Sequence, residues 1–165
     1  MNVGVISDTH DNVPAVEAAV EAFESRSVET VVHCGDFIAP PVIPFFDGFE
    51  FHGVLGNNDG EIDGLGRTFR TQPGATLHGR FADLELGEAR FAVLHGEDLE
   101  EVETIAESGE YDYVCYGHHH VSEVREVGET TVLNPGAQFP TVAEEHRSVA
   151  VVDTDADEVE LVGLL

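Results

Sequence analysis

The sequence predicts an α/β fold in which two β-sheets pack face to face and helices flank them. Two observations support this prediction. In the first half of the chain, short apolar runs alternate with segments of helical periodicity, which is typical of strands joined by helices. Further along, short apolar runs are separated by Gly-containing turns, which favours hairpins. A strand–helix half followed by a hairpin-rich half indicates two packed sheets rather than one.

The first part of the chain predicts three buried strands and one helix. Asn12 can cap a helix over residues 13–25, because Pro14 fits its first turn and apolar residues then recur at helical spacing. Residues 40–46 carry three prolines, so we expect a broken turn or one short helical piece there. The three strands are expected at residues 3–7, 29–34 and 49–55.

The second part of the chain predicts a loop, one helix and many short strands. Gly60 to Gly74 is expected to be rich in loop. Residues 75–78, 81–86 and 89–94 are expected as successive antiparallel strands, because glycine-containing turns separate them. The acidic run 97–108 has one apolar face and predicts a helix. Further strands are expected at residues 112–116, 122–127, 130–133, 148–153 and 158–163.

The length of 165 residues fits a single domain spanning residues 1–165, large enough to bury a core without disulfides or structural metals. Cys34 and Cys115 lie in apolar runs and form no CxxC motif, so we expect two buried, reduced thiols. No apolar run approaches the ~20 residues of a membrane span. The N-terminus lacks the basic residues and cleavage site of a signal peptide. We therefore expect a cytoplasmic protein without a membrane partner.

The charge balance is strongly acidic. There are 33 acidic residues against 7 basic ones, all Arg, and the formal net charge is −26. This self-repulsion destabilises a compact state at low salt, whereas at ~1 M salt the Debye length falls to ~3 Å. The composition therefore predicts a halophilic, salt-accumulating host. Nucleic acid is disfavoured as a partner at low salt because its phosphates are repelled, but a nucleotide or oligonucleotide stays open in multimolar salt.

Five predicted strands are followed directly by polar residues with metal-ligating side chains. A glycine stands beside four of the five groups and lets the backbone turn sharply and approach a ligand closely. Because ligands of open α/β sheets bind beyond the carboxyl ends of the strands, we expect the five groups to converge on one rim. In chain order, the groups are Asp8 with His10, Asp36, Asn57 to Asp59, His95, and His118 to His120.

This rim carries two carboxylates, one amide and four imidazoles that can bind cations. Nitrogen and oxygen ligands without thiolate suit Mn²⁺, Fe²⁺, Co²⁺, Ni²⁺ or Zn²⁺, and we expect Mn²⁺ first. Seven ligands exceed what one ion usually takes from protein, but they suffice for two divalent ions if one carboxylate bridges. Asp36 is the natural bridge because it lies between the two halves of the set. The seven predicted ligands are Asp8, His10, Asp36, Asn57, His95, His118 and His120.

Five motifs, taken in order, resemble the calcineurin-like metallophosphoesterase superfamily. Their spacing, the short chain and the later Asn134-Pro135-Gly136 turn are similar to its small YfcE-like branch, from residue 3 to about residue 140. The resemblance implies a four-layer sandwich of two mixed β-sheets flanked by helices. The motifs are Ser7-Asp8-Thr9-His10, Gly35-Asp36, Gly56-Asn57-Asn58-Asp59, His95-Gly96 and Gly117-His118-His119-His120.

The resemblance also implies how the ligands divide between two ions. It implies a phosphoesterase, with a phosphodiesterase favoured over a monoesterase, in which a hydroxide bridging the two ions attacks the phosphorus of a small-molecule or nucleotide substrate. The first ion would be held by Asp8, His10, Asp36 and His120, and the second by Asp36, Asn57, His95 and His118.

One position departs from the family pattern. The third residue of the Gly-Asn-x-Asp motif is often a His that pairs with the following Asp and can protonate the leaving group, but here it is Asn58. An amide cannot act as a general acid. Either the leaving group is already acidic, or water or another residue supplies the proton, with His119 and His33 as the local candidates. We assign Asn57, Asp59 and His119 to the catalytic set.

The remaining polar residues have simpler interpretations. His33 lies in an apolar strand and is interpreted as a hydrogen-bonded core histidine. His119 lies between two ligands, so it points away from the ions if its neighbours point toward them. Asn134 either bonds a ligand loop or only forms a turn. His52, His78 and His146 are expected at the surface or behind the ligands.

Two other functions stay open at this point. The small branch also resembles the retromer scaffold subunit, which uses the same fold to bind partner proteins. A phosphomonoesterase could use the same metal site. Because all seven ligand positions keep competent side chains, the enzyme is favoured over a catalytically weak, metal-binding scaffold. The sequence leaves the natural substrate, the physiological metal and homo-oligomer formation undetermined.

Overall fold

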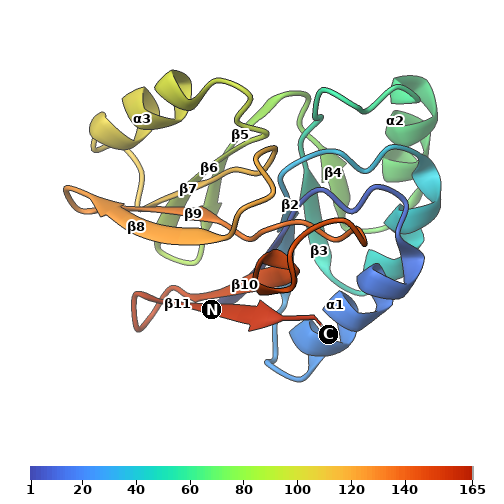
Figure 1. Cartoon of the computed structure of the whole chain (residues 1–165), viewed down its shortest axis with the longest axis horizontal. Coiled ribbons are helices and arrows are strands. Elements are labelled where there is room, and N and C mark those ends of the chain that lie inside the picture. Colours follow the sequence, from blue (N-terminus) through green and yellow to red (C-terminus); the bar gives the residue numbers. More distant parts are fainter. Residues whose placement is uncertain (165) are drawn as a thin grey trace.

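A computed structural model describes residues 1–164, which form two mixed β-sheets (Figure 1). In the six-stranded sheet, β1 to β4 are parallel, and β10 and β11 extend it as antiparallel strands. Its order is β11 (Glu158–Gly163), β10 (Ser148–Asp153), β1 (Asn2–Ile6), β2 (Thr30–His33), β3 (Glu50–Gly53) and β4 (Ala75–Leu77). The five-stranded sheet has the order β5 (Phe81–Leu86), β6 (Ala89–Leu94), β7 (Tyr113–Cys115), β9 (Thr130–Asn134) and β8 (Glu123–Val127).

Helices cover the outer face of each sheet, and the predicted four-layer sandwich is confirmed. The helix α3 lies on one outer side of the molecule, and α1 and α2 lie on the other (Figure 1). Two short 3-10 helices, η1 and η2, lie in the connections. The bounds are α1 Val13–Glu24, η1 Pro40–Phe46, α2 Ile62–Thr71, α3 Leu99–Glu107 and η2 Glu144–His146.

Three apolar cores separate the four layers. Phe23, Phe37 and Phe51 are fully buried between α1, η1, α2 and the six-stranded sheet. The core between the two sheets contains both cysteines, which are buried, free thiols as expected. A smaller core joins α3 to the five-stranded sheet. Each fully buried aromatic or aliphatic side chain contributes roughly 1.5–3 kcal/mol, so these cores fix the strands whose ends carry the polar groups.

Two segments differ from the sequence prediction. Gly60 to Gly74, expected as loop, contains α2, because Leu65 and Phe69 are four residues apart on one buried helical face. Gly64 and Gly66 lower the helix propensity and hid that periodicity. The strand expected at residues 75–78 is β4, but it pairs in parallel with β3 rather than with β5. The Gly79-Arg80 segment therefore connects the two sheets and is not a hairpin turn.

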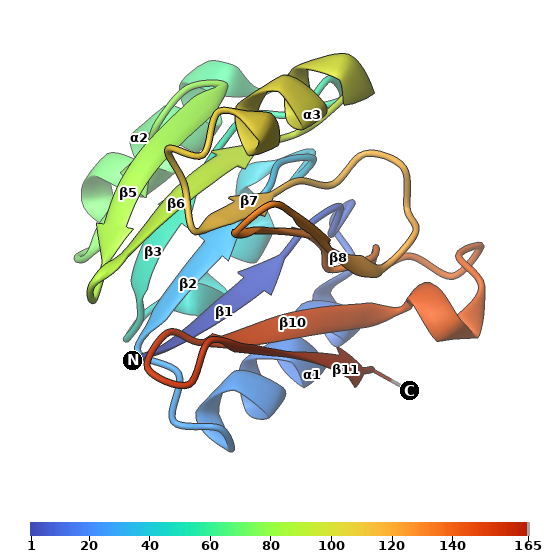
Figure 2. The same cartoon turned by 90° about the vertical axis from the view of Figure 1, so that its left-hand side faces the viewer.

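The other predicted elements are confirmed. The strands β10 and β11 have the predicted bounds, and the proline-rich 40–46 segment is one short 3-10 helix. The side chain of Asn12 accepts a hydrogen bond from the Ala15 amide and caps α1. The parallel strands β1, β2 and β3 end at one rim, beside the ends of β6 and β7 in the second sheet (Figure 2). Within residues 1–164, none of the helices is both long and apolar enough to cross a membrane.

The surface charge is only partly compensated by ion pairs. Arg26, Arg90 and Arg125 pair with nearby carboxylates. The chain has 33 acidic residues but only 7 basic ones, so most of the carboxylates have no basic residue to pair with. We predict that the melting temperature rises by roughly 5–10 °C when KCl is raised from 0.1 to 2 M, equivalent to about 2–3 kcal/mol at this chain length. Differential scanning calorimetry measures this rise. A protein that melts highest without salt would contradict the halophilic assignment.

Candidate metal centre

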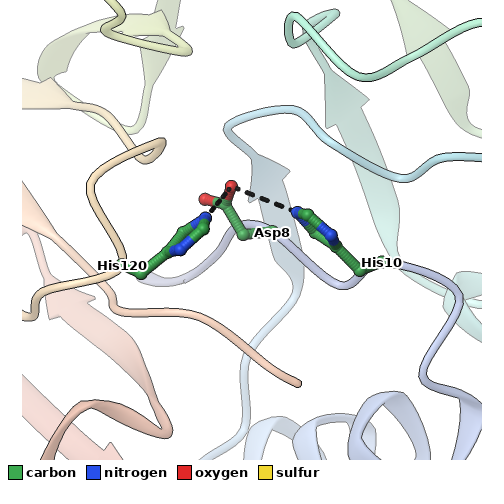
Figure 3. A group of neighbouring side chains, drawn as sticks. All are labelled: Asp8, His10 and His120. Carbon is green, nitrogen blue, oxygen red and sulfur yellow. Dashed lines mark ion pairs between the residues drawn. The ribbon is translucent and has the colours of Figure 1, made fainter. Parts of the chain in front are cut away.

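Asp8 follows β1 and presents one carboxylate oxygen to the rim. Its Oδ2 accepts hydrogen bonds from the Ser7 hydroxyl at 2.5 Å and from the His118 amide at 3.0 Å. Its Oδ1 is buried and has no hydrogen-bond partner among residues 1–164. Figure 3 shows this carboxylate between the rings of His10 and His120, whose Nε2 atoms lie 3.7 and 3.3 Å from Oδ1. Oδ1 is therefore free to bind a cation that these two imidazoles also face.

Asp36 follows β2, and its carboxylate lies between His10 and His95. Its Oδ2 is 3.3 Å from Nε2 of His10 and 3.4 Å from Nε2 of His95. Its Oδ1 accepts the backbone N–H of Asn58, and the Asn58 side-chain amide donates to Oδ2, each at 2.9 Å. This central position agrees with the predicted bridging role of Asp36.

Two overlapping groups of side chains have the spacing of metal ligands. Asp8, His10 and His120 form one group, and Asp8, Asp36 and His95 form the other, each with ligand atoms within 4.8 Å of one another. Nδ1 of His95 is bonded to the Cys34 carbonyl at 2.8 Å, so Nε2 faces the carboxylates.

Asn57 and His118 complete the rim on the side of the second group. The Oδ1 of Asn57 lies 3.0 Å from Nδ1 of His118, and the ring of His118 packs edge-on to that of His95 with centroids 5.1 Å apart. Both residues are at least partly exposed. The structure thus brings all seven predicted ligands to one rim.

Unsatisfied polar atoms indicate that this rim fits cations. Five buried side-chain atoms lack a hydrogen-bond partner within residues 1–164, and three of them belong to predicted ligands: Oδ1 of Asp8, Nε2 of His10 and Nε2 of His95. Leaving such an atom unpaired costs about 1–3 kcal/mol. Their concentration in one place is unusual for a folded interior, and divalent cations would satisfy all three.

The backbone of the ligands is also strained. Five of the seven predicted ligands have a positive φ, which costs an L-residue roughly 1–2 kcal/mol each. Such strain persists only where the surroundings fix it, and it clusters at functional sites. The five are Asp8 (φ 52°), His10 (42°), Asp36 (61°), His118 (65°) and His120 (58°).

Glycines allow the ligand loops to approach one another. A Cβ on Gly117 would lie 1.9 Å from the Ser7 hydroxyl oxygen and 2.5 Å from Oδ2 of Asp8. A Cβ on Gly56 would lie 2.1 Å from Oδ1 of Asp36. These glycines are therefore required by close contact with the two carboxylates, as the sequence motifs predicted.

The ionisable groups of the rim are strongly coupled. Burial raises the pKa of the Asp8 and Asp36 carboxyls, but the facing histidines outweigh it and hold both pKa values well below their usual range. Burial lowers the pKa of His10, yet Asp36 and Asp8 raise it to about 9. The pKa of His95 is likewise raised, because the same two carboxylates outweigh its burial. Without metal, the two carboxylates therefore favour the protonated form of both imidazoles.

Metal binding should therefore compete with protons. The raised pKa of His10 stabilises the metal-free fold below pH ~6.5, and that stabilisation is lost as pH rises through about 9. A coordinating imidazole must be neutral, so the affinity for Mn²⁺ should rise across the same window. Isothermal titration calorimetry in buffers of different ionisation enthalpy would detect the released protons. An affinity that is constant from pH 6.5 to 9 would contradict this expectation.

Two residues assigned to the catalytic set contact backbone in this structure. The Asp59 carboxylate accepts hydrogen bonds from the amides of Asp36 (2.9 Å), Ile38 (2.8 Å) and Gly56 (2.7 Å). It thereby holds the loop that carries Asp36. The His119 side chain donates through Nε2 to the Gly96 carbonyl at 2.8 Å, in the loop that follows His95.

The histidines that were not predicted as ligands lie in the core or in other hydrogen-bonded positions. His33 is fully buried, and burial lowers its pKa to about 3. His52 and His78 bond to each other at 2.9 Å on β3 and just after β4. His146 bonds Ser122. The side-chain amide of Asn134 donates to the Gly117 carbonyl at 3.1 Å and supports the last ligand loop.

Phe139 was missed by sequence reasoning. Its ring lies 4.4 Å from that of His10 and 4.7 Å from that of His120, centroid to centroid. It therefore packs against both imidazoles. It lies between η2 and β9 in an irregular segment without periodicity, so no sequence signal marked it.

Known proteins resemble this chain over most of its length. The profile of the calcineurin-like phosphoesterase superfamily domain matches residues 1–157. A curated relative, phosphodiesterase MJ0936 of Methanocaldococcus jannaschii, is 37% identical over 138 residues, which are 82% of this chain and 83% of the relative.

Solved structures share the fold. One, described as a novel archaeal phosphodiesterase, has a TM-score of 0.87 and 32% identity and covers 99% of this chain and 100% of its own. The Escherichia coli phosphoesterase YfcE (TM-score 0.72, 20% identity) and a zinc-complexed Vps29 of Entamoeba histolytica (0.70, 19%) each align over the full length of both chains and show the fold alone. The chain therefore belongs to the calcineurin-like phosphoesterase superfamily.

Proposed function

We propose that the chain is a phosphodiesterase that requires two divalent cations, with Mn²⁺ as the first candidate. The observation that carries this proposal is the set of three unpaired, buried ligand atoms around Asp8 and Asp36. The family, the relative named as a phosphodiesterase and the solved structure described as one support a phosphodiester as the substrate.

The proposed assignment divides the ligands between two ions that share Asp36. When bound, the cations would supply Lewis-acid charge for the phosphoryl oxygens and lower the pKa of an attacking water. The first ion would be held by Asp8, His10, Asp36 and His120, and the second by Asp36, Asn57, His95 and His118.

The protein's own groups would orient these ligands. Ser7 and the His118 amide fix one oxygen of Asp8, and Asn58 fixes both oxygens of Asp36. Asn57 is exposed, and His10, His118 and His120 are half-buried, so these ligands could be reached by a substrate from solvent. Preorganised ligands of this kind avoid reorganisation during the reaction.

The leaving group should lack an efficient proton donor. The Asn58 amide donates to Asp36 and has no acidic proton, and both nitrogens of His33 are buried and hydrogen-bonded. Since general acid catalysis contributes 10²–10⁴-fold, we predict that nitrophenyl diesters are cleaved at least ~100-fold faster than alkyl diesters. Steady-state kinetics measures the ratio of the rates on the two substrates. Asn58→His should lower this ratio, because the imidazole can protonate an alkyl leaving group. Equal rates on both substrates would count against this prediction.

The experiment that tests the function is a substrate panel with metals added back. Metal-stripped protein in 2 M KCl would receive Mn²⁺, Ni²⁺ or Zn²⁺ and be assayed on bis-p-nitrophenyl phosphate and p-nitrophenyl phosphate. We expect metal-dependent hydrolysis that is faster on the diester. Faster hydrolysis of the monoester would instead identify a phosphomonoesterase.

A scaffold for partner proteins is the second candidate, favoured by the likeness of fold to Vps29. It predicts metal binding without turnover in the same panel. The complete set of seven ligands supports the enzyme, because a pure scaffold needs no strained, unsatisfied ligands.

A further inference from the structure

Two loops carry three of the ligands of the proposed centre and run side by side. The first ligand loop is residues 8–11, after β1, and the second is residues 35–38, after β2. Three backbone hydrogen bonds join them, from the amides of Asp8, His10 and Asp11 to the carbonyls of Gly35, Asp36 and Phe37, at 3.0, 3.2 and 3.2 Å. Both loops contain ligands with left-handed backbone. Such strained backbone persists only where neighbouring residues hold it, so a side chain that contacts both loops would fix their mutual position.

His33 lies beneath both loops and contacts each of them. It ends β2 and is fully buried. The Gly35 amide lies 3.1 Å from its Nδ1, and the Thr9 hydroxyl lies 3.1 Å from its Nε2. Thr9, which is also fully buried, separates the ligands Asp8 and His10, and Gly35 directly precedes Asp36.

The hydrogen bonds determine the tautomer of this ring. The Gly35 N–H can only donate, so Nδ1 of His33 is the acceptor and carries no proton. A neutral ring then carries its proton on Nε2 and donates it to the Thr9 hydroxyl oxygen. The ring is stacked on Phe37 with centroids 3.7 Å apart, which holds its plane.

We propose that His33 is a positioning residue that joins the two ligand loops and holds Asp8, His10 and Asp36 in place before a cation arrives. It lies behind the ligands and touches no substrate. Burying two ring nitrogens costs free energy that an apolar side chain of similar size would not cost. In this structure, the two nitrogens of His33 are used to hydrogen-bond Gly35 in one loop and Thr9 in the other. This inference rests on the proposed function for its role, but the tautomer and its two bonds are properties of the metal-free protein.

The first experiment tests, in the metal-free protein, whether His33 forms the two hydrogen bonds that join the loops. The ¹⁵N chemical shifts of His33 in the metal-free protein should show a neutral ring protonated on Nε2, with a slowly exchanging ring proton. Thr9→Val removes the acceptor and should make that proton exchange rapidly, whereas Thr9→Ser keeps the hydroxyl and should preserve it. A ring protonated on Nδ1, or an exchange rate unaffected by Thr9→Val, would overturn the proposal.

The second experiment measures affinity for Mn²⁺ by calorimetry. Residues that orient metal ligands typically change affinity 10–100-fold. His33→Asn keeps an acceptor near the Gly35 amide but is too short for Thr9, so affinity should fall about 10–100-fold; Thr9→Val should act similarly, and Thr9→Ser should stay within a few-fold of wild type. The double variant should lose little more than either single one, since both break one bridge.

A control separates positioning from general destabilisation. Leu86 is buried at the end of β5 that pairs with the start of β6, remote from His95 at the other end of β6. Leu86→Ala should lower the melting temperature while leaving Mn²⁺ affinity unchanged. If it lowers affinity as much as Thr9→Val does, His33 is only structural. Wild-type protein that shows the predicted tautomer but binds no Mn²⁺ would overturn the metal centre and the positioning role, while leaving the bridge itself established.

Discussion

Asp36→Ala is expected to abolish binding of both cations and to lower phosphodiester hydrolysis at least ~10³-fold. Asp36 lies 3.3 and 3.4 Å from the Nε2 atoms of His10 and His95, closer than Asp8 at 3.7 and 3.9 Å, so its loss should remove a ligand from each proposed ion. Cations at such centres contribute several kcal/mol of charge stabilisation, and about 1.4 kcal/mol corresponds to a factor of ten in rate.

Two variants control this experiment. Asp36→Asn keeps the shape and the contact with the Asn58 amide but removes the charge, so it should also lose activity while folding normally. Asp83→Ala removes an exposed carboxylate that pairs with Arg90 and should leave metal binding intact. Metal content by elemental analysis and rates in high KCl provide the readouts. An Asp36→Ala protein that still binds two equivalents of Mn²⁺ would contradict the bridging assignment.

Gly56→Ala is expected to be the most disruptive single-methyl change in the ligand loops. The added Cβ would lie 2.1 Å from Oδ1 and 2.6 Å from the backbone nitrogen of Asp36. A backbone atom cannot move aside as a side chain does, so the strain should cost about 3 kcal/mol or more and displace the Asp36 carboxylate.

Gly60→Ala provides a matched control. Gly60 lies in the same connection, and a Cβ there would meet nothing within 4 Å. Its free energy of unfolding should stay within about 0.5 kcal/mol of wild type. Urea denaturation of the metal-free proteins compares the two variants directly. Equal stability and equal Mn²⁺ affinity for both would show that the close approach of Gly56 to Asp36 does not matter.

The elements that sequence predicted well have strong local signals. The bounds of β10 and β11 follow from apolar runs with turn residues on either side, and Asn12 marks the start of α1. The helix α2 was missed because two glycines interrupt its apolar face. The pairing of β4 with β3 could not be predicted, because a glycine-containing turn looks the same whether it joins neighbouring strands or two sheets.

The convergence of the seven candidate ligands could be predicted because strand ends place residues wherever the sheet topology brings those ends together. The features that support metal binding most strongly were not visible in the sequence. Left-handed backbone at Asp8 and His118, and the unpaired Nε2 of His95, depend on contacts between distant loops. The bond of Asn58 to Asp36, and the commitment of Asp59 to three backbone amides, likewise appear only in three dimensions.

Anomalous diffraction from crystals grown with Mn²⁺ tests the central claim most directly. We predict two anomalous peaks, one beside Asp8, His10 and His120 and one beside Asn57, His95 and His118, with Asp36 between them. A single peak, or peaks away from these side chains, would contradict a centre of two cations sharing one carboxylate.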